Sequence, residues 1–302
     1  LLCGVYTIIN KWHSTSEKAM RLLMKFGGTS VADAPCIARV VDILEQHHNK
    51  GDELAVVVSA QRGVTDQLIE IAKALVTSKD ASAIEPLINA LRTRHMTTLA
   101  GAAPGFVNEV GPIIEERLED LNNILHAVHN LRELTPRSKD YIISYGERLL
   151  APIFGAAIEQ RGIPSVVMDG CEAGIVTTSQ HGESTALPDC DEQVRRRIGG
   201  VLKTSVPVIM GFMGCTSDGN VTTLGRSGSD YSASIIGAGI DANEIWIWTD
   251  VDGIMTSDPR VINNARVIPE LSYLEVMELS YFGAKVMHPR SIEPAMRSTA
   301  AG

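Results

Sequence analysis

The chain has 302 residues, of which 44% are hydrophobic, and this is enough to build a core in one large or two modest domains. Its 27 basic and 36 acidic side chains give a net charge of −9. This acidic balance argues against a nucleic-acid partner, because binding to a phosphate backbone relies on clustered Lys and Arg. No apolar run reaches the ~20 residues that a membrane span needs, so we expect no membrane partner either.

The cysteines suggest a reducing compartment. They are odd in number, widely scattered and without a C-x-x-C pair: Cys3, Cys36, Cys171, Cys190 and Cys215. This pattern predicts reduced thiols in a cytoplasmic protein, and neither a disulfide framework nor a zinc site. None of the eight histidines lies in an H-E-x-x-H setting, so we expect no metal held by the protein itself.

The first residues carry no clear structural signal. The stretch Leu1–Ile9 is moderately apolar, but no basic segment precedes it as in a signal peptide. The chain begins with Leu, and Met20 stands immediately before the first convincing strand. We therefore expect residues 1–19 to be a non-native or disordered extension without a function.

A glycine-rich turn follows the first predicted strand, Arg21–Phe26. The stretch Lys25–Ser30 reads Lys-Phe-Gly-Gly-Thr-Ser and is soon followed by a helical pattern. A strand that opens through glycines into a helix presents free N–H groups and a favourable helix dipole to an anion, and the lysine suits phosphate. The order differs from a Walker A loop, and an ordinary βα turn with a half-buried lysine explains this stretch equally well.

The first half of the chain then alternates helices and strands. Helical spacing of apolar residues predicts a helix from Pro35, capped by Asp33, and another over residues 68–76. Between them, Leu54–Val58 is typical of a strand buried on both faces of a parallel sheet. It ends in the polar loop Ser59–Thr65, at the end of a strand where open α/β sheets bind ligands.

A long helical stretch follows. Residues 82–134 carry no strand signal and are expected to form helices that pack on each other. Residues 141–160 are also expected to be helical, but Glu147 and Arg148 interrupt an otherwise apolar face. These two residues form either a surface ion pair or part of a site.

The second half contains further glycine-lined strand ends. Short strands are predicted at 166–168, 175–177, 206–210 and 244–250, and helices at 191–203, 231–236 and 273–279. Gly211–Gly214 follows one strand, and Thr223–Asp230 places glycines, an Arg and an Asp at the start of a helix. The alternation predicts an α/β fold: a three-layer αβα sandwich with a largely parallel central sheet.

Five motifs together resemble those of the aspartate kinase family, in the family's order. They are Lys-Phe-Gly-Gly-Thr-Ser (25–30), Ser-Tyr-Gly-Glu-Arg (144–148), Leu-Gly-Arg-Ser-Gly-Ser-Asp-Tyr-Ser-Ala (224–233), Trp-Thr-Asp-Val-Asp-Gly (248–253) and Phe-Gly-Ala-Lys-Val-Met-His-Pro (282–289). The resemblance covers about residues 21–296. It implies the amino-acid kinase fold for residues 20–302, with an amino-acid-binding lobe over about 20–204 and a nucleotide-binding lobe over about 205–302.

The resemblance implies transfer of the γ-phosphoryl group of ATP to the side-chain carboxylate of L-aspartate, giving 4-phospho-L-aspartate. This is the entry step to lysine, threonine and methionine. ATP and Mg²⁺ are the implied cofactors, with Mg²⁺ carried by the ATP phosphates, and the full-length protein is expected to be a homo-oligomer. A carboxylate with a pKa of about 3.9 is already ionised at neutral pH, so this nucleophile needs no general base.

The same resemblance assigns roles to individual residues. Lys25 would stabilise the transferring phosphoryl group, Gly27 and Gly28 would let the backbone approach it, and Asp230 would orient Lys25. Arg226 would bind the α-carboxylate of the substrate and Glu147 its ammonium group. Ser59, Thr65 and Ser229 would hold substrate oxygens, and the nucleotide site would be lined by Thr249, Asp250, Arg260 and Lys285.

The sequence departs from the family pattern in three places. Met255 stands where the family often has Tyr near the nucleotide, and Ser227 replaces a common Gly in an exposed loop. The family also continues into a further strand and regulatory ACT domains, so we expect the fold to be C-terminally truncated here and the ACT domains to be absent. Two other functions stay open: a sister kinase acting on another carboxylate such as glutamate, and a non-catalytic nucleotide-binding fragment.

Overall fold

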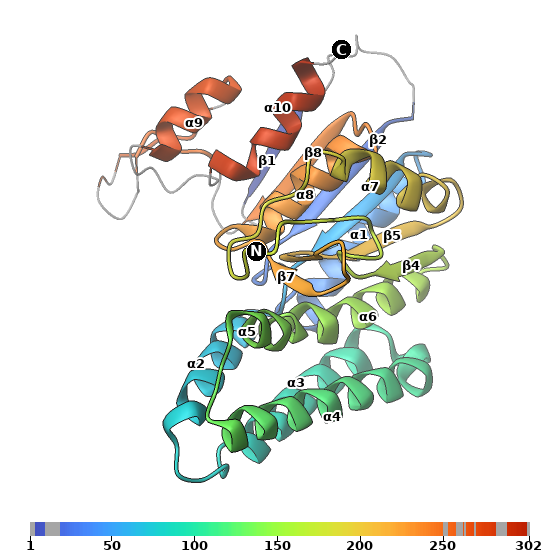
Figure 1. Cartoon of the computed structure of the whole chain (residues 1–302). Helices are drawn as coiled ribbons and strands as arrows, with labels where there is room; N and C mark the ends of the chain where they lie inside the picture. Colours follow the sequence, from blue (N-terminus) through green and yellow to red (C-terminus); the bar gives the residue numbers. More distant parts are fainter. Residues whose placement is uncertain are drawn as a thin grey trace.

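The computed structural model describes residues 4–9, 19–249, 253–257, 262, 264–268, 270–281 and 289–300. In this part of the chain, a six-stranded sheet with the order β1-β8-β2-β3-β5-β4 lies between two helical layers (Figure 1). Five strands pair in parallel: β2 (Arg21–Phe26), β3 (Glu53–Val58), β4 (Ser165–Met168), β5 (Val206–Met210) and β8 (Glu244–Thr249). The predicted three-layer sandwich with a largely parallel sheet is confirmed.

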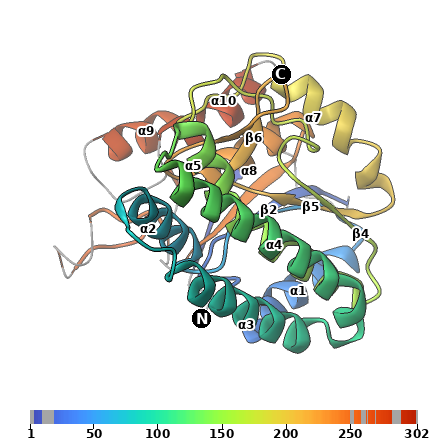
Figure 2. The same cartoon turned by 60° about the horizontal axis from the view of Figure 1, so that its bottom comes forward.

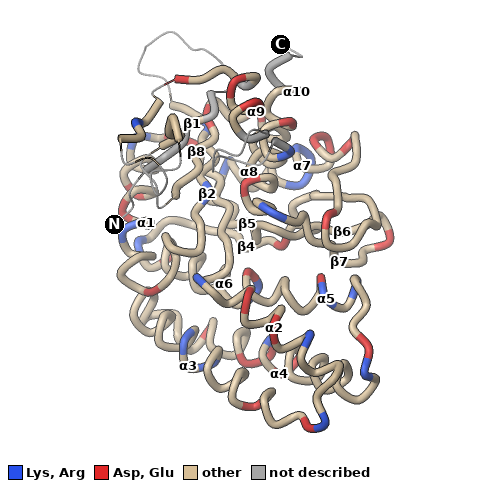
Figure 3. The backbone as a smooth tube through the Cα atoms, turned by 90° about the vertical axis from the view of Figure 1, so that its left-hand side faces the viewer, with Lys and Arg blue, Asp and Glu red and all other residues tan. Residues whose placement is uncertain are grey.

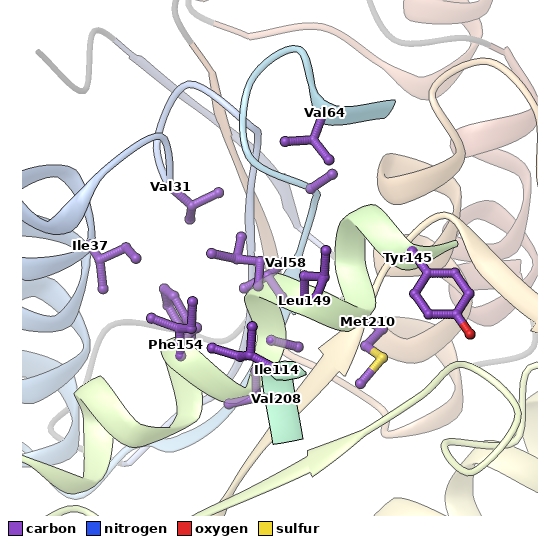
Figure 4. Close-up of a cluster of buried hydrophobic side chains, with 14 of the residues drawn as sticks. Val31, Ile37, Val58, Val64, Ile114, Tyr145, Leu149, Phe154, Val208 and Met210 are labelled. Carbon is purple, nitrogen blue, oxygen red and sulfur yellow. The ribbon is translucent and has the colours of Figure 1, made fainter. Parts of the chain in front are cut away.

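One face of the sheet is covered by α1 (Ala34–His48) and α6 (Tyr145–Glu159). Their apolar sides meet alternate residues of the central strands, such as Met24, Val56 and Val208, in a continuous core. Figure 4 shows part of this core, where Ile37 of α1 and Phe154 of α6 point towards each other near Val58. Asp33 caps α1 as predicted, because its side chain accepts a hydrogen bond from the N–H of Cys36.

The predicted helical stretch packs outside this layer. It forms α3 (Ile84–Ala102), the short 3-10 helix η1 (Pro104–Phe106) and α4 (Val107–Leu131), and the two long helices lie side by side against α1 and α6 (Figure 2). The helices α2 (Val64–Thr77) and α5 (Pro136–Ile143) pack beside α4 and α6 on the same side of the sheet. None of the helices in the described part of the chain is both long and apolar enough to cross a bilayer.

The opposite face of the sheet is covered by α7 (Cys190–Ile198), α8 (Gly228–Gly239) and α10 (Glu293–Ala300). The other alternate strand residues, including Leu23, Val57 and Ile209, are buried against them. The strands are therefore buried on both faces, which explains their continuous apolar runs. The remaining elements are η2 (Val201–Lys203), α9 (Tyr273–Tyr281) and η3 (Pro289–Ser291).

A small two-stranded ribbon, β6 (Met213–Cys215) and β7 (Val221–Thr223), stands beside the main sheet. The strand predicted at 175–177 is reduced to single bridges, of which Val176 pairs with Cys215. The prediction of reduced thiols is wrong here, because Cys171 and Cys215 form a disulfide. The two residues are 44 apart in sequence, and only the fold brings their Cα atoms to 5.2 Å, so their spacing gave no sign of the bond.

The N-terminal segment also differs from expectation. Residues Gly4–Ile9 form β1, which pairs antiparallel with β8 at the edge of the sheet, so this part of the expected extension is not disordered. Unpaired N–H and C=O groups along the edge of β8 provide a template for such pairing. Whether residues 1–19 are native stays a prediction.

Candidate active site

The site lies where β2, β3 and β5 end side by side. The N–H of Ser59 donates to the carbonyl of Phe26 at 3.1 Å, and the N–H of Gly211 donates to the carbonyl of Val58 at 2.9 Å, which joins the three strand ends. A pocket of about 310 Å³ opens at this edge. It is lined by Lys25, Gly28, Ser59, Ala60, Gln61, Arg62, Gly63, Thr65, Asp66, Glu147, Phe212, Gly225, Ser227, Gly228, Ser229 and Asp230.

Lys25 supplies a fixed positive charge to this pocket. It belongs to β2, which holds its backbone between β3 and β8, and its side chain is only 11% exposed. Its Nζ lies 2.5 Å from Oδ1 of Asp230, in the first turn of α8. This close pairing in a partly buried site holds the ammonium group in one direction, which suits the stabilisation of an anion.

The N-terminus of α8 contributes further anion-binding character. Its N-cap, Ser227, makes no side-chain cap hydrogen bond and adopts φ = 52°, in the left-handed region that favours glycine. The first N–H groups of a helix have no intrahelical partner and carry a partial positive charge. Ser229 in the same turn accepts a hydrogen bond from the hydroxyl of Ser59 at 2.9 Å, so α8 is tied to the end of β3.

Glu147 is the most unusual group in the pocket. It is 3% exposed, and its Oε1 accepts a hydrogen bond from the N–H of Ala60 at 3.0 Å. Its Oε2 is buried and has no hydrogen-bond partner among the described residues. Burial raises the pKa of Glu147 to about 8, although the N–H of Ala60 opposes this rise. A buried carboxyl group with a free oxygen in a pocket is suited to receive a cationic group.

The alternative of a surface ion pair between Glu147 and Arg148 is wrong. The side chain of Arg148 turns away to Ser144, whose Oγ accepts from its Nε at 3.0 Å, and to Asp169 at 4.0 Å. Successive helix residues point in different directions, so neighbours in sequence rarely pair on a helix.

Two glycines allow the pocket walls to approach each other. A Cβ on Gly28 would lie 2.7 Å from the carbonyl oxygen of Ala60, and a Cβ on Gly146 would lie 2.6 Å from the Cβ of Ala60. Both distances are too short for real atoms. Glycine at these positions therefore lets the Lys25–Ser30 turn and the start of α6 close on Ala60 from two sides.

Most of the residues that the sequence analysis selected come together here. Those that line the pocket are Lys25, Gly28, Ser59, Thr65, Glu147, Ser229 and Asp230. Gly27 lies next to them, since a Cβ there would be 3.6 Å from Nζ of Lys25. Thr249 ends β8, beside the end of β2. Asp250, Arg260 and Lys285 lie outside the described residues.

Arg226 is not a lining residue in this structure. Its neighbours Gly225 and Ser227 line the pocket, but its own side chain is exposed. The turn at Gly225–Ser227 therefore carries Arg226 at the rim of the pocket.

Several lining residues are not among the predicted site residues, including Ala60, Gln61, Asp66 and Phe212. Ala60 contributes through its backbone N–H, which no residue type reveals. Gln61 and Phe212 lie in strand-end loops that the sequence did indicate, and φ = 68° at Phe212 marks a sharp turn between β5 and β6. The available signal was the position of these loops at the ends of strands.

The charges of the wider surface are mixed. In Figure 3, Lys and Arg are interspersed with Asp and Glu along the described backbone. Within the described residues, no three His, Cys, Asp or Glu side chains are grouped so that they could hold a metal ion.

Comparison with known proteins gives a consistent result. The model of the amino acid kinase family matches residues 20–301. Aspartokinase 1, chloroplastic, of Arabidopsis thaliana is 34% identical over 284 residues, which is 92% of this chain and 48% of that protein. Aspartate kinase of Pseudomonas fluorescens is 30% identical over 272 residues, which is 90% of this chain and 52% of that protein. The chain thus spans about half the length of these relatives.

Among solved structures, E. coli aspartokinase III in complex with aspartate and ADP is similar, with a TM-score of 0.81 and 30% sequence identity. The match covers 92% of this chain and 60% of that chain. The aspartate kinase of Clostridium acetobutylicum matches with a TM-score of 0.65 at 28% identity.

Proposed function

Since the chain belongs to the amino acid kinase family, we propose that it carries an aspartate kinase activity. It transfers the γ-phosphoryl group of ATP to the side-chain carboxylate of L-aspartate, giving 4-phospho-L-aspartate and ADP. Relatives named aspartokinase, and a structural neighbour with bound aspartate and ADP, support this choice within the family.

One observation carries the proposal. A single pocket of about 310 Å³ contains the Lys25–Asp230 ion pair and the buried, unpartnered Oε2 of Glu147. A fixed cation suits a phosphoryl group, and a buried carboxylate suits the ammonium group of an amino acid. The volume of the pocket suits a small substrate that carries both the ammonium group and the attacking carboxylate.

For this phosphoryl transfer the protein has to position the two substrates and neutralise their charge. The attacking carboxylate is ionised at neutral pH and needs no base. The chain must bring two anions together in line and neutralise the charge that spreads over the transferring group. Lys25 and the N-terminal end of the α8 dipole do this, and Asp230 holds Lys25 in place.

The remaining groups hold the amino acid. Glu147 binds its ammonium group, and Ser59, Thr65 and Ser229 bind its oxygens. Arg226 turns from the rim of the pocket to bind the α-carboxylate in a two-point ion pair. Replacing Arg226 with Gln should therefore raise the KM for aspartate by at least tenfold and leave the KM for ATP unchanged; equal changes in both would contradict this role.

The nucleotide binds on the β8 side, where Thr249 ends the strand and Asp250, Arg260 and Lys285 follow in sequence. Mg²⁺ is carried by the ATP phosphates, as fits a pocket in which the nearby carboxylate of Asp230 is engaged by Lys25. When bound, Mg²⁺ neutralises phosphate charge.

The test is ADP release coupled to a detectable reaction, with L-aspartate, L-glutamate and N-acetylglutamate compared at equal concentration. Hydroxylamine trapping of the acyl phosphate identifies the product. We expect turnover and trapping with aspartate. A preference for either other substrate would replace the substrate assignment, and folded protein that yields no acyl phosphate with any of them would refute kinase activity.

A further inference from the structure

The loop from Ser59 to Arg62 contacts three walls of the pocket. The Ser59 hydroxyl donates to Ser229 of α8, and the N–H of Ala60 donates to Glu147 of α6. The N–H of Arg62 donates to the carbonyl of Gly28 at 3.1 Å, which joins the loop to the Lys25–Ser30 turn. Each residue in turn makes a contact with a different element, and Gln61 makes its contact through its side chain.

Gln61 is buried to an unusual degree for a loop residue, with 1% exposure. Its Nε2 donates to the carbonyl of Ala32 at 3.2 Å and to Oγ1 of Thr98 in α3 at 3.0 Å. The orientation of the amide is fixed chemically, because the carbonyl of Ala32 can only accept. Thr98 also donates its own hydrogen to the carbonyl of Arg94 at 2.9 Å, so its oxygen is left to accept from Gln61.

This arrangement is a poor solution for stability alone. With Nε2 facing Ala32 and Thr98, Oε1 of Gln61 is buried without a hydrogen-bond partner among the described residues. Leaving such a group buried and unpaired is unfavourable, and an apolar side chain of similar volume would avoid that cost. The presence of an amide at this position is therefore better explained by the position in which it holds the loop than by a contribution to the stability of the fold.

Helix α3 holds the same loop at a second point. Nη2 of Arg94, one turn before Thr98, donates to the carbonyl of Arg62 at 2.9 Å. Helix α3 packs beside α1 and α4, away from the sheet (Figure 2). Helix α3 thus contributes no side chain to the pocket, but it binds two successive residues of the Ser59–Arg62 loop, Gln61 and Arg62.

We infer that Gln61 is a positioning residue, which through Thr98 and Ala32 fixes the backbone of Ala60 against Glu147 and the hydroxyl of Ser59 against Ser229. The inference rests on the proposed function, since these two contacts set the amino-acid side of the reaction. Displacing a binding group by about 1 Å can cost a hundredfold in rate, so a tether of two hydrogen bonds matters at this place.

The test compares Gln61→Met, which keeps volume and removes both hydrogen bonds, with Thr98→Val, which removes one acceptor. Thr98→Ser keeps that acceptor and serves as the rescue variant. Thr97→Val makes the same change at the neighbouring exposed position and serves as the matched control. Steady-state kinetics for both substrates, binding of L-aspartate by calorimetry and thermal unfolding are measured for each.

We expect Gln61→Met to raise the KM and Kd for aspartate about tenfold or more, with the KM for ATP within twofold of the wild type. Thr98→Val should raise them to a smaller extent. The double variant should bind aspartate no more weakly than Gln61→Met, because both substitutions remove the same contact between Gln61 and Thr98. Thr98→Ser should recover most of the affinity, and Thr97→Val should match the wild type.

The pH profile separates positioning from a merely structural role. If Ala60 moves away from Glu147, the carboxylate loses the N–H that opposes the effect of burial, and the pKa of Glu147 rises further. The pH below which aspartate affinity is lost should therefore be higher in Gln61→Met than in the wild type. Unchanged aspartate affinity in Gln61→Met, or equal losses for both substrates with an unshifted profile, would overturn the inference. Wild-type protein that binds aspartate but yields no acyl phosphate would refute the proposed function alone, because the role of Gln61 is then decided by the Kd values.

Discussion

Glu147 gives the sharpest prediction, because its ionised form lowers the stability of the fold but is the form that binds an ammonium group. Burial raises its pKa from 4.5 to about 8. At 1.36 kcal/mol for each pKa unit, ionising this carboxyl group in the empty pocket costs roughly 5 kcal/mol more than in the unfolded chain. We therefore expect Glu147→Gln, which resembles the protonated carboxyl group, to be more stable than the wild type at alkaline pH.

The sign of the pH dependence follows from the two protonation states. Between pH 4.5 and about 8 the folded chain keeps a proton that the unfolded chain has lost. The wild type should therefore lose stability with a slope of roughly 1.36 kcal/mol per pH unit from this group across that window. Glu147→Gln lacks this loss, so the difference between the two proteins should be near zero below pH 4.5 and reach its maximum above pH 8.

Urea unfolding of both proteins at intervals from pH 4 to pH 9 measures this difference. Aspartate binding should show the opposite trend: wild-type affinity should rise about tenfold per pH unit from pH 6 towards the pKa of about 8, because the ammonium group requires the ionised form. Glu147→Gln should bind aspartate weakly at every pH. Stability curves that stay parallel over the whole range would refute the account of Glu147 as a buried group that is protonated in the empty pocket.

Three other substitutions test separate parts of the structure. Lys25→Ala should lower kcat by at least 10²–10³-fold while circular dichroism stays that of the folded protein, since it removes the cation at the transferring group; retained turnover would refute its role. Gly146→Ala would place a methyl group 2.6 Å from the Cβ of Ala60, so we expect a loss of about 1–3 kcal/mol in urea unfolding and a higher KM for aspartate, whereas a neutral result would show that the walls need not approach so closely. Cys171→Ser should cost about 2–4 kcal/mol of stability, because the bond to Cys215 closes a loop of 44 residues, and a reductant should destabilise the wild type alone.

The sequence predicted the sheet, its two helical layers and the charged residues of the pocket because these depend on patterns within short segments. Continuous apolar strands with polar ends indicate a buried parallel sheet and the edge where ligands bind. Lys25, Glu147 and Asp230 were indicated by the family motifs in which they stand, because the residues taken singly left an ordinary turn or a surface ion pair open. Their meeting in one pocket follows from the parallel order of the strands.

Other features depend on atoms or distances that the sequence does not contain. The N–H of Ala60 is present in almost any residue, so its role as the donor to Glu147 becomes visible only in the fold. The disulfide joins residues from separate elements, and the pairing of residues 4–9 with β8 depends on an open sheet edge. Gln61 was part of a recognised loop, but its contact with Thr98 crosses from that loop to a helix that the sequence showed only as packed.

The balance of charge in the pocket explains why Arg226 should move inwards. The lining residues include two cations, Lys25 and Arg62, and three acids, Asp66, Glu147 and Asp230. Once Glu147 is ionised, this lining carries a net charge of about −1, and aspartate with its two carboxylates and one ammonium group adds another −1. Two negative charges in a pocket that must also admit the phosphates of ATP would repel the second substrate. A further cation would reduce this repulsion, and Arg226 stands between two lining residues with φ of 75° at Gly225 and 52° at Ser227. We therefore expect its exposed side chain to turn inwards and pair with the α-carboxylate when aspartate binds.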